Sequence, residues 1–280
     1  MKKQILLVAA VMGFTFSNAQ DLMSKDGHKM LPEAGDIGLG FDANPLFNYV
    51  GNMFNGSTGN SFNAGWENGN QAIMGKYFLD ANKAIRGSVR LGFGSTTSNF
   101  LVTDDAAVAA DPASTAEVND AMKNSYNAIV LGGGMEFRRG HNRLQGYYGG
   151  QMLISLGGDK TEYTYGNAIN TTTGVATTAD FAGGSSAMGT RALTSKTGTF
   201  GFGLQGFIGV EYFFAPKISV SAEYGWGLGF SSIGDSEVTG ETFNLANSTV
   251  DATSGTVAGA SSFGIDTDNN GGAIRLMFHF

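Results

Sequence analysis

A glycine pattern near the middle of the chain is the first candidate for ligand chemistry. Gly201, Gly203 and Gly206 have the G-x-G-x-x-G spacing of dinucleotide sites. In those sites the glycines form the turn between a strand and a helix, where the phosphates bind. Here apolar residues keep alternating past the pattern as far as Tyr212. The glycines are therefore predicted to lie inside a continuing strand, and no nucleotide cofactor is expected.

An acidic stretch near the C-terminus could bind a metal ion. Asp266, Asp268 and Asn270 present oxygens at alternate positions and Gly271 follows them, as in the first half of an EF-hand calcium loop. The twelfth position of that loop requires a bidentate glutamate, but Met277 stands there. A polar junction between a loop and a strand is the preferred interpretation, and weak Ca²⁺ binding by acidic loops stays open.

Catalysis has few candidate residues. The three histidines, His28, His141 and His279, form no Ser-His-acid set, and they are interpreted as solvated or interfacial side chains. The chain contains no cysteine, which excludes disulfides, thiolate metal sites and cysteine nucleophiles. We expect a protein that is not an enzyme, with no cofactor and no catalytic residues.

The last ten residues indicate what surrounds the chain. In Gly271–Phe280 every second side chain is large and apolar, namely Ile274, Leu276, Phe278 and Phe280. Period-2 alternation predicts a strand with two different faces. A soluble edge strand of this kind would invite aggregation, whereas a closed barrel in lipid has no free edge and needs an apolar outer face.

The same alternation recurs along the chain and predicts an all-β fold. The predicted strands are 36–41, 71–79, 85–94, 125–138, 143–156, 199–213, 218–230 and 271–280. Short connections follow the second, fourth and sixth strands, and long ones follow the others, as in outer-membrane barrels. The fold expected is an eight-stranded antiparallel up-and-down transmembrane β-barrel with four long extracellular loops and three short periplasmic turns. A short capped helix is predicted at Pro112–Met122.

Composition and charge agree with this fold. Of 280 residues 43 are Gly and only 15% are charged, and the mean hydropathy is near zero, as expected where a membrane signal is hidden in alternation. A net charge of −7 disfavours nucleic acid as a partner. Residues 95–122 and 231–269 carry acids and no Lys or Arg, whereas the short turns carry Lys83, Arg139 and Lys217.

The N-terminus has the pattern of a secretory leader. Lys2 and Lys3 precede an apolar run at Ile5–Phe16, and Ser17–Ala19 is a small-x-small cleavage site. The expected organisation is a signal peptide at 1–19, a periplasmic lead-in at 20–34 and a barrel at 35–280. An even number of strands then leaves both termini in the periplasm of a Gram-negative cell.

Strand parity predicts which side chains fill the barrel. Eight strands enclose a bore that side chains fill, and charges inside it must be paired. The predicted interior network consists of Lys76, Arg86, Arg90, Glu136, Glu211, Glu223 and Arg275, with Asp36 and Asp42 near the first strand. Inward glycines leave room for Tyr147 and Phe207, so the interior is expected to be plugged. Outside, Trp226 is predicted near the outer interface and Tyr77, Tyr148 and Tyr212 near the inner one.

In these features the chain resembles the eight-stranded outer-membrane barrels of the OmpX type and the transmembrane domain of the OmpA type. The resemblance rests on the leader end at Ser17–Gln20, on the alternating strands, and on the terminal Phe280, which matches the C-terminal assembly signal. Residues 35–45 also resemble first strands of small barrels from Bacteroidota. The resemblance implies a structural or surface-interaction role in the outer membrane, with lipid, the barrel-assembly machinery and other envelope proteins as partners. Two alternatives remain, a narrow channel for small solutes and an accessory subunit of an outer-membrane complex.

Overall fold

The protein is almost entirely β-structure in a computed structural model that describes residues 22–43, 73–266 and 273–280. One short helix, α3, spans Asp105–Ala110. The strands are β1 (Ile37–Asp42), β2 (Ile73–Asp80), β3 (Lys83–Thr103), β4 (Glu117–His141), β5 (Leu144–Thr164), β6 (Ala176–Ala179), β7 (Ser185–Met188), β8 (Thr190–Ala215), β9 (Ile218–Ile233), β10 (Ser236–Asn244), β11 (Thr249–Val257), β12 (Ala260–Asp266) and β13 (Ala273–His279). No described helix is long and apolar enough to span a membrane.

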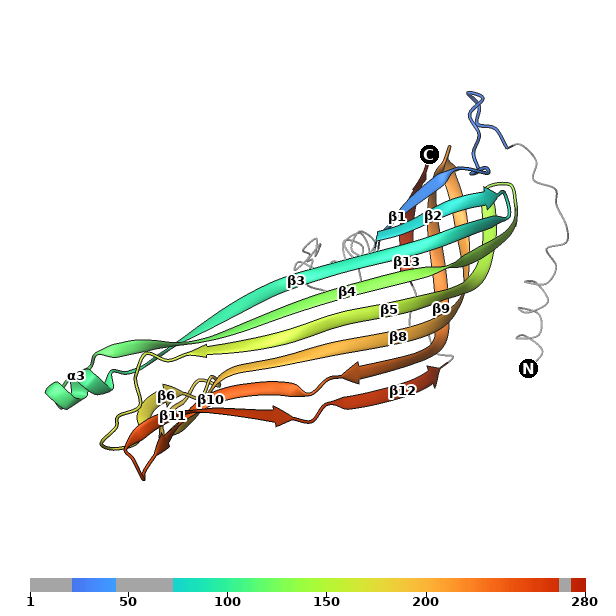
Figure 1. The fold of residues 1–280 in the computed structure, drawn as a ribbon. Helices are drawn as coiled ribbons and strands as arrows, with labels where there is room; N and C mark the ends of the chain where they lie inside the picture. Colours follow the sequence, from blue (N-terminus) through green and yellow to red (C-terminus); the bar gives the residue numbers. More distant parts are fainter. Residues whose placement is uncertain (1–21, 44–72, 267–272) are drawn as a thin grey trace, which may run out of the picture.

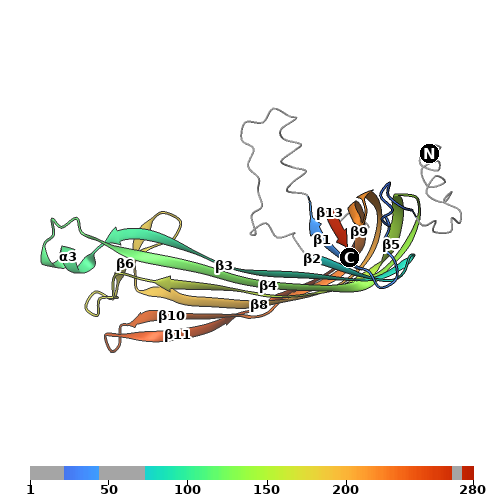
Figure 2. The same cartoon turned by 90° about the horizontal axis from the view of Figure 1, so that it is seen from above.

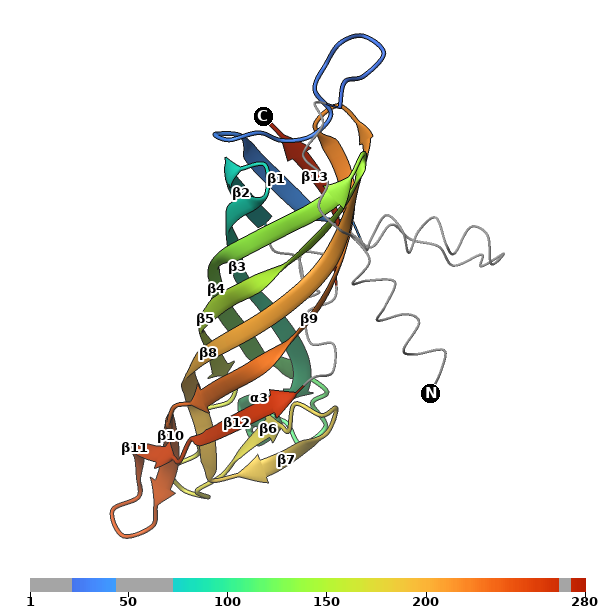
Figure 3. The ribbon, with the colours of Figure 1, turned by 90° about the vertical axis from the view of Figure 1, so that its right-hand side faces the viewer.

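Eight of these strands form a closed ring. Neighbours pair antiparallel in the order β8-β5-β4-β3-β2-β1-β13-β9, and a further pairing of β9 with β8 closes the circuit (Figure 1). Viewed from the side in Figure 3, the ring strands are steeply tilted and the C-terminus lies at the end that carries the short turns. Those tight turns, after β2, β4 and β8, lie where the sequence predicts them.

The predicted number of strands is wrong, because the described residues form thirteen strands rather than eight. Part of the difference is interruption of long strands. Both β9 and β10 pair with β8, and residues 234–235 separate them. Along the other side, β12 and β13 both pair with β9. The remaining strands outside the ring are β11, which pairs with β10, and a separate hairpin of β6 and β7.

Three of the predicted long loops are also largely strand. Beyond the ring, β3, β4, β5 and β8 continue without a break and join β10 and β11 in a curved sheet, here called the extension (residues 95–127, 157–198 and 234–257) (Figures 1 and 2). The extension is rich in Ser, Thr and Asn, so the apolar alternation that marks the ring strands ends there. Antiparallel pairing nevertheless continues, as in Thr97 opposite Lys123.

The predicted helix at Pro112–Met122 is wrong. Glu117–Met122 belongs to β4 and pairs with β3. The helix observed is α3, which begins after Asp104, whose carboxylate accepts hydrogen bonds from the N–H groups of Ala106 and Ala107. An aspartate N-cap followed by alanines stabilises a short helix. In residues 117–122, by contrast, pairing with the neighbouring strand determines the conformation.

The outer and inner faces of the ring differ in polarity, and the outer face is the more apolar one. The outward side chains are mostly large, apolar and exposed; among them are Leu39, Tyr77, Ile85, Leu131, Tyr148, Leu156, Phe200, Leu204, Tyr212 and Phe230. The inward side chains include many polar and charged groups, and most of these are buried. Met277 and His279 lie over Gly40 and Gly38 of β1, where an added Cβ would collide with their side chains.

Candidate functional site

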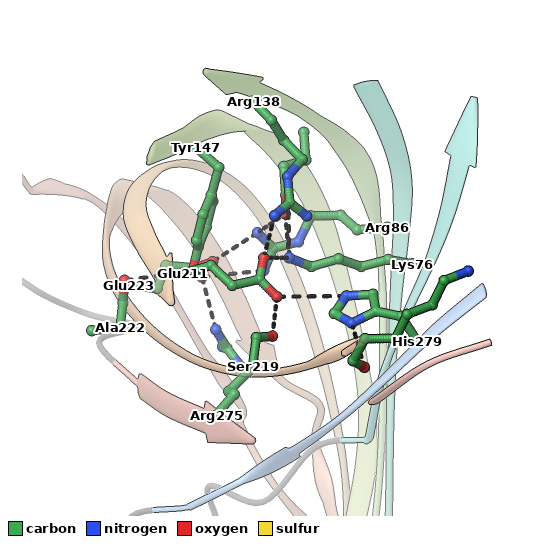
Figure 4. Close-up of polar contacts among 12 residues, drawn as sticks. Lys76, Arg86, Arg138, Tyr147, Glu211, Ser219, Ala222, Glu223, Arg275 and His279 are labelled. Carbon is green, nitrogen blue, oxygen red and sulfur yellow. Dashed lines mark hydrogen bonds and ion pairs between the residues drawn. The ribbon is translucent and has the colours of Figure 1, made fainter. Parts of the chain in front are cut away.

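A network of charged side chains fills one end of the ring (Figure 4). Lys76 comes from β2, Arg86 from β3, Glu211 from β8 and Glu223 from β9, and each is at most 8% exposed. Glu136 and Arg138 come from β4, and Arg275 from β13. Side chains along a strand point alternately to its two faces. On each of these six strands the named residues lie on the inward face, so their side chains meet in the interior.

Glu211 is the centre of the half of the network nearer the short turns. Its carboxylate lies 2.7 Å from the guanidinium of Arg138 and 3.5 Å from the ammonium of Lys76. The Ser219 hydroxyl donates a hydrogen bond to it, and Nε2 of His279 lies 3.5 Å away. This carboxylate therefore has partners on four sides.

Glu223 organises the other half. Arg86 binds it in a bidentate arrangement, with distances of 2.8 and 3.1 Å, and Arg275 lies 3.3 Å away. Glu136 joins the two halves, because it is 2.9 Å from Lys76, 3.5 Å from Arg138 and 3.8 Å from Arg86. Four cations and three carboxylates thus form one connected set.

Aromatic rings surround the cations. The guanidinium carbon of Arg86 lies 3.9 Å from the ring centre of Phe207, and Nζ of Lys76 lies 4.7 Å from that of Tyr147. Arg138 lies over Phe78 and Phe213, at 5.1 and 5.8 Å. Cation–π contacts of this kind are stronger when the groups are desolvated. Buried charges persist only when they are paired in this way, so the network packs this part of the bore with paired ionic groups.

Six of the seven residues predicted for this network come together, and one does not. Arg90 lies on the inward face of β3, four residues beyond Arg86, and makes no ion pair with any described residue. Asp36 pairs instead with Lys217 at the rim, and Asp42 is half-buried at the end of β1. Tyr147 and Phe207 are buried inside as predicted.

Sequence reasoning missed two members of the site. Arg138 shares the parity of Glu136 and is 2% exposed, but it stands beside a basic turn and was assigned no interior role. His279 was interpreted as solvated or interfacial, and that is wrong because it is only 4% exposed and packs between Phe78 and Phe213, with ring centres at 5.5 and 5.3 Å. Its alternation with Phe278 and Phe280 was the signal available. His28 and His141 are exposed.

The other predicted motifs have the following positions. Gly201–Gly206 lies within β8, as the alternation predicts. Asp266 is the last residue of β12, and Asp268 and Asn270 lie outside the described residues. Among the residues that are described, no group of three or more His, Cys, Asp or Glu side chains could hold a metal ion. Trp226 faces outward on β9, with its ring against Gly206, and Phe280 pairs with Ile37.

A second buried polar cluster holds the β6–β7 hairpin to the extension. Asp120 is fully buried and accepts hydrogen bonds from the N–H groups of Gly166 and Ala179, at 2.8 and 2.9 Å. The amide of Asn167 donates to the carbonyls of Thr103 and Thr177. These bonds join the hairpin to β3 and β4, so this part of the extension has a folded core of its own.

Aromatic residues complete that core. The ring of Phe181 lies 5.4 Å from that of Phe100, 5.0 Å from Tyr163 and 6.0 Å from Tyr165. Arg191 stacks over Tyr165 at 4.2 Å and pairs with Glu241 at 2.6 Å. Burial raises the pKa of Tyr165 to about 12, although the charge of Arg191 acts in the opposite direction.

In comparisons with known proteins, no protein-family model and no curated protein matches the chain.

Proposed function

We propose that the ring is a transmembrane β-barrel of a bacterial outer membrane and that the protein is a non-enzymatic structural or surface-interaction protein whose interior is plugged. The observation that carries this proposal is the inverted distribution of side chains, with charges packed inside and Leu, Ile and Phe exposed outside. Leaving such a side chain in water forgoes about 1.5–3 kcal/mol each, whereas contact with lipid removes that cost.

The height of the apolar surface fits a bilayer. On β5 the outward apolar positions run from Leu144 to Leu156. Twelve steps of about 3.3 Å at a tilt of about 40° give roughly 30 Å along the membrane normal, which is the thickness of a hydrocarbon core.

The outward face changes from apolar to polar across the same stretch of four neighbouring strands. Leu91, Ile129, Leu156 and Phe200 lie in a single register row across four strands. Four residues further along, the corresponding row is Ser95, Ser125, Lys160 and Lys196. A boundary shared by four strands supports a membrane surface close to it, with the extension beyond the hydrocarbon.

The extension favours the surface-interaction role over the channel. In the described residues it carries many acids and few bases, so it presents a negatively charged sheet beyond the proposed membrane. The paired charges of the interior, by contrast, obstruct the bore.

The test combines location with conductance. The chain is produced with its own leader in a Gram-negative host, and the membranes are washed with carbonate and urea. We expect the protein to remain with the outer-membrane fraction and to shift in gel mobility on heating, and we expect the purified protein to add no single-channel conductance to planar bilayers. A folded protein in the soluble periplasmic fraction would overturn the membrane assignment, and reproducible conductance steps would favour the channel.

A further inference from the structure

The N-terminal segment Leu22–Asp36, here called the strap, runs along the end of the ring that carries the short turns (Figure 3). It is bonded to two separate places on the rim. The N–H of Lys217, in the β8–β9 turn, donates to the carbonyl of Met30 at 3.1 Å, and the N–H of Gly35 donates to the carbonyl of Phe78 on β2 at 2.8 Å. Between β9 and β2 in the ring lie β13 and β1, so the strap bridges strands that do not pair with each other.

The strap is also folded within itself. The N–H of Met30 donates to the carbonyl of Leu22, and the N–H of Ser24 donates to the carbonyl of His28. Gly27 adopts a φ of +77° at the bend, a conformation that glycine accepts without strain. A segment with these internal bonds presents a defined surface to the ring.

That surface is apolar where it meets the ring. Met30 is only 1% exposed and Pro32 is buried, whereas Lys25, Asp26 and Lys29 are exposed. Phe78, Phe213 and His279 occupy the interior at the same end. These rings border the charge network, because Arg138 lies over Phe78 and Phe213 and Nε2 of His279 is 3.5 Å from Glu211.

Lys217 connects the strap to this end of the interior. Its N–H binds Met30 of the strap, and its carbonyl accepts the N–H of His279, at 2.8 Å. Its ammonium pairs with the carboxylate of Asp36, which also accepts a hydrogen bond from the N–H of Glu33 at 2.8 Å. One turn residue therefore bonds the middle of the strap, its C-terminal end and the last ring strand.

We propose that the strap is a separable seal, latched by Lys217 and Asp36, that closes the short-turn end of the ring independently of the charge network. The ring then has two barriers in series, an outer apolar one supplied by Met30 and the aromatic rings, and an inner one of ion pairs. Displacing the strap exposes His279 and the aromatic rings without breaking any ion pair of the inner barrier.

The first test uses the absence of cysteine in the chain. Single variants Met30→Cys and Lys25→Cys are treated with a charged, membrane-impermeant thiol reagent, with the protein in detergent micelles, or in buffer if it needs no detergent. We expect Cys at 25 to react at once and Cys at 30 to react slowly. Adding Asp36→Asn removes the charge-assisted latch, so modification at 30 should accelerate by about tenfold or more. Lys29→Ala, which removes the exposed pair with Glu33 and leaves Lys217 and Asp36 in place, is the control and should leave the rate at position 30 unchanged.

A second measurement covers the case in which these variants fold poorly. With His28 and His141 replaced by Asn, His279 is the one histidine left, and its carbethoxylation is followed by ultraviolet absorbance. We expect protection in the otherwise intact protein and rapid modification when residues 22–33 are deleted, with heat-dependent gel mobility as the check of folding. Equal rates with and without the strap, or equal labelling at positions 25 and 30, would overturn the proposal. Neither readout requires that the ring resides in a membrane.

Discussion

Neutralising Glu211 is the sharpest test of the interior network. Glu211→Gln keeps the size of the side chain and removes the charge that Arg138 and Lys76 approach at 2.7 and 3.5 Å. With an effective dielectric constant near 20, those two attractions amount to about 6 and about 5 kcal/mol. Burying the charged carboxylate costs several kcal/mol of desolvation, and the neutral variant does not pay that cost. Subtracting it from the lost attractions leaves an expected net destabilisation of about 3–5 kcal/mol.

The assay is unfolding by urea of the protein refolded in detergent or phospholipid vesicles, followed by tryptophan fluorescence, with Trp66 replaced by Phe in every variant so that Trp226 on β9 is the reporter. The charge count provides the control. Four cations face three carboxylates in the wild type, and four face two in Glu211→Gln, whereas Glu211→Gln with Arg138→Met leaves three facing two and restores the original excess of one cation. The double variant should therefore lose less stability than the sum of the single losses, by about 1 kcal/mol or more.

Two results would refute this reasoning. A Glu211→Gln protein within about 0.5 kcal/mol of the wild type would mean that the charge of Glu211 contributes no net stability. Additive losses in the double variant would mean that Glu211 and Arg138 do not act through each other. As a reference, Glu162→Gln in the exposed Lys160–Glu162 pair should leave unfolding unchanged, because exposed pairs are screened by water.

Three further predictions concern other parts of the chain. Gly149→Ala should destabilise the ring by about 1–3 kcal/mol in the same assay, because a Cβ there meets the carbonyl of Met135 and the ring of Phe207, whereas Gly133→Ala, which projects into open space, should be neutral. Asp120→Ala removes two hydrogen bonds to a buried carboxylate, so limited proteolysis between residues 166 and 188 should accelerate about tenfold or more while heat-dependent gel mobility is retained. Backbone N–H groups of Ala182 and Gly184 lower the pKa of Asp180 below 3.8. The turn that they form should persist above pH 3.8 and loosen as the pH falls through the lowered value. The protection of those two amides from hydrogen exchange, relative to their intrinsic rates, would report this, and protection that does not fall at low pH would contradict the assignment.

Side-chain alternation explains why the interior could be anticipated from sequence. Alternation places Glu136, Glu211 and Glu223 on the inward faces of their strands, and it identifies in the same way the inward basic residues that can pair with them. The structure brings six of the seven expected charges together. Arg90 shows what alternation leaves undetermined. Alternation tells which face of the strand a side chain is on, but it does not tell how far along the bore the side chain lies. Arg138 was overlooked because the end of a strand and the start of a turn have the same local composition.

The extension could not be anticipated in the same way. Its strands lack the apolar alternation that a half-buried sheet requires, and their Ser, Thr and Asn residues also occur in loops. What holds them is pairing with a neighbour already fixed by the ring, together with buried contacts such as those of Asp120 with the β6–β7 hairpin. Such contacts join residues far apart in the chain, and no local window of sequence contains them.

Continuity of the ring strands has a mechanical consequence. From Phe200 to Thr190, β8 runs ten residues beyond the last apolar row, a distance of roughly 33 Å along the strand. The same hydrogen-bonded ladder passes through the ring and into the projecting sheet with no hinge between them. A partner bound at the far end of the extension would therefore be held at a fixed distance and angle from the ring. A force applied there would be transmitted directly to the ring strands.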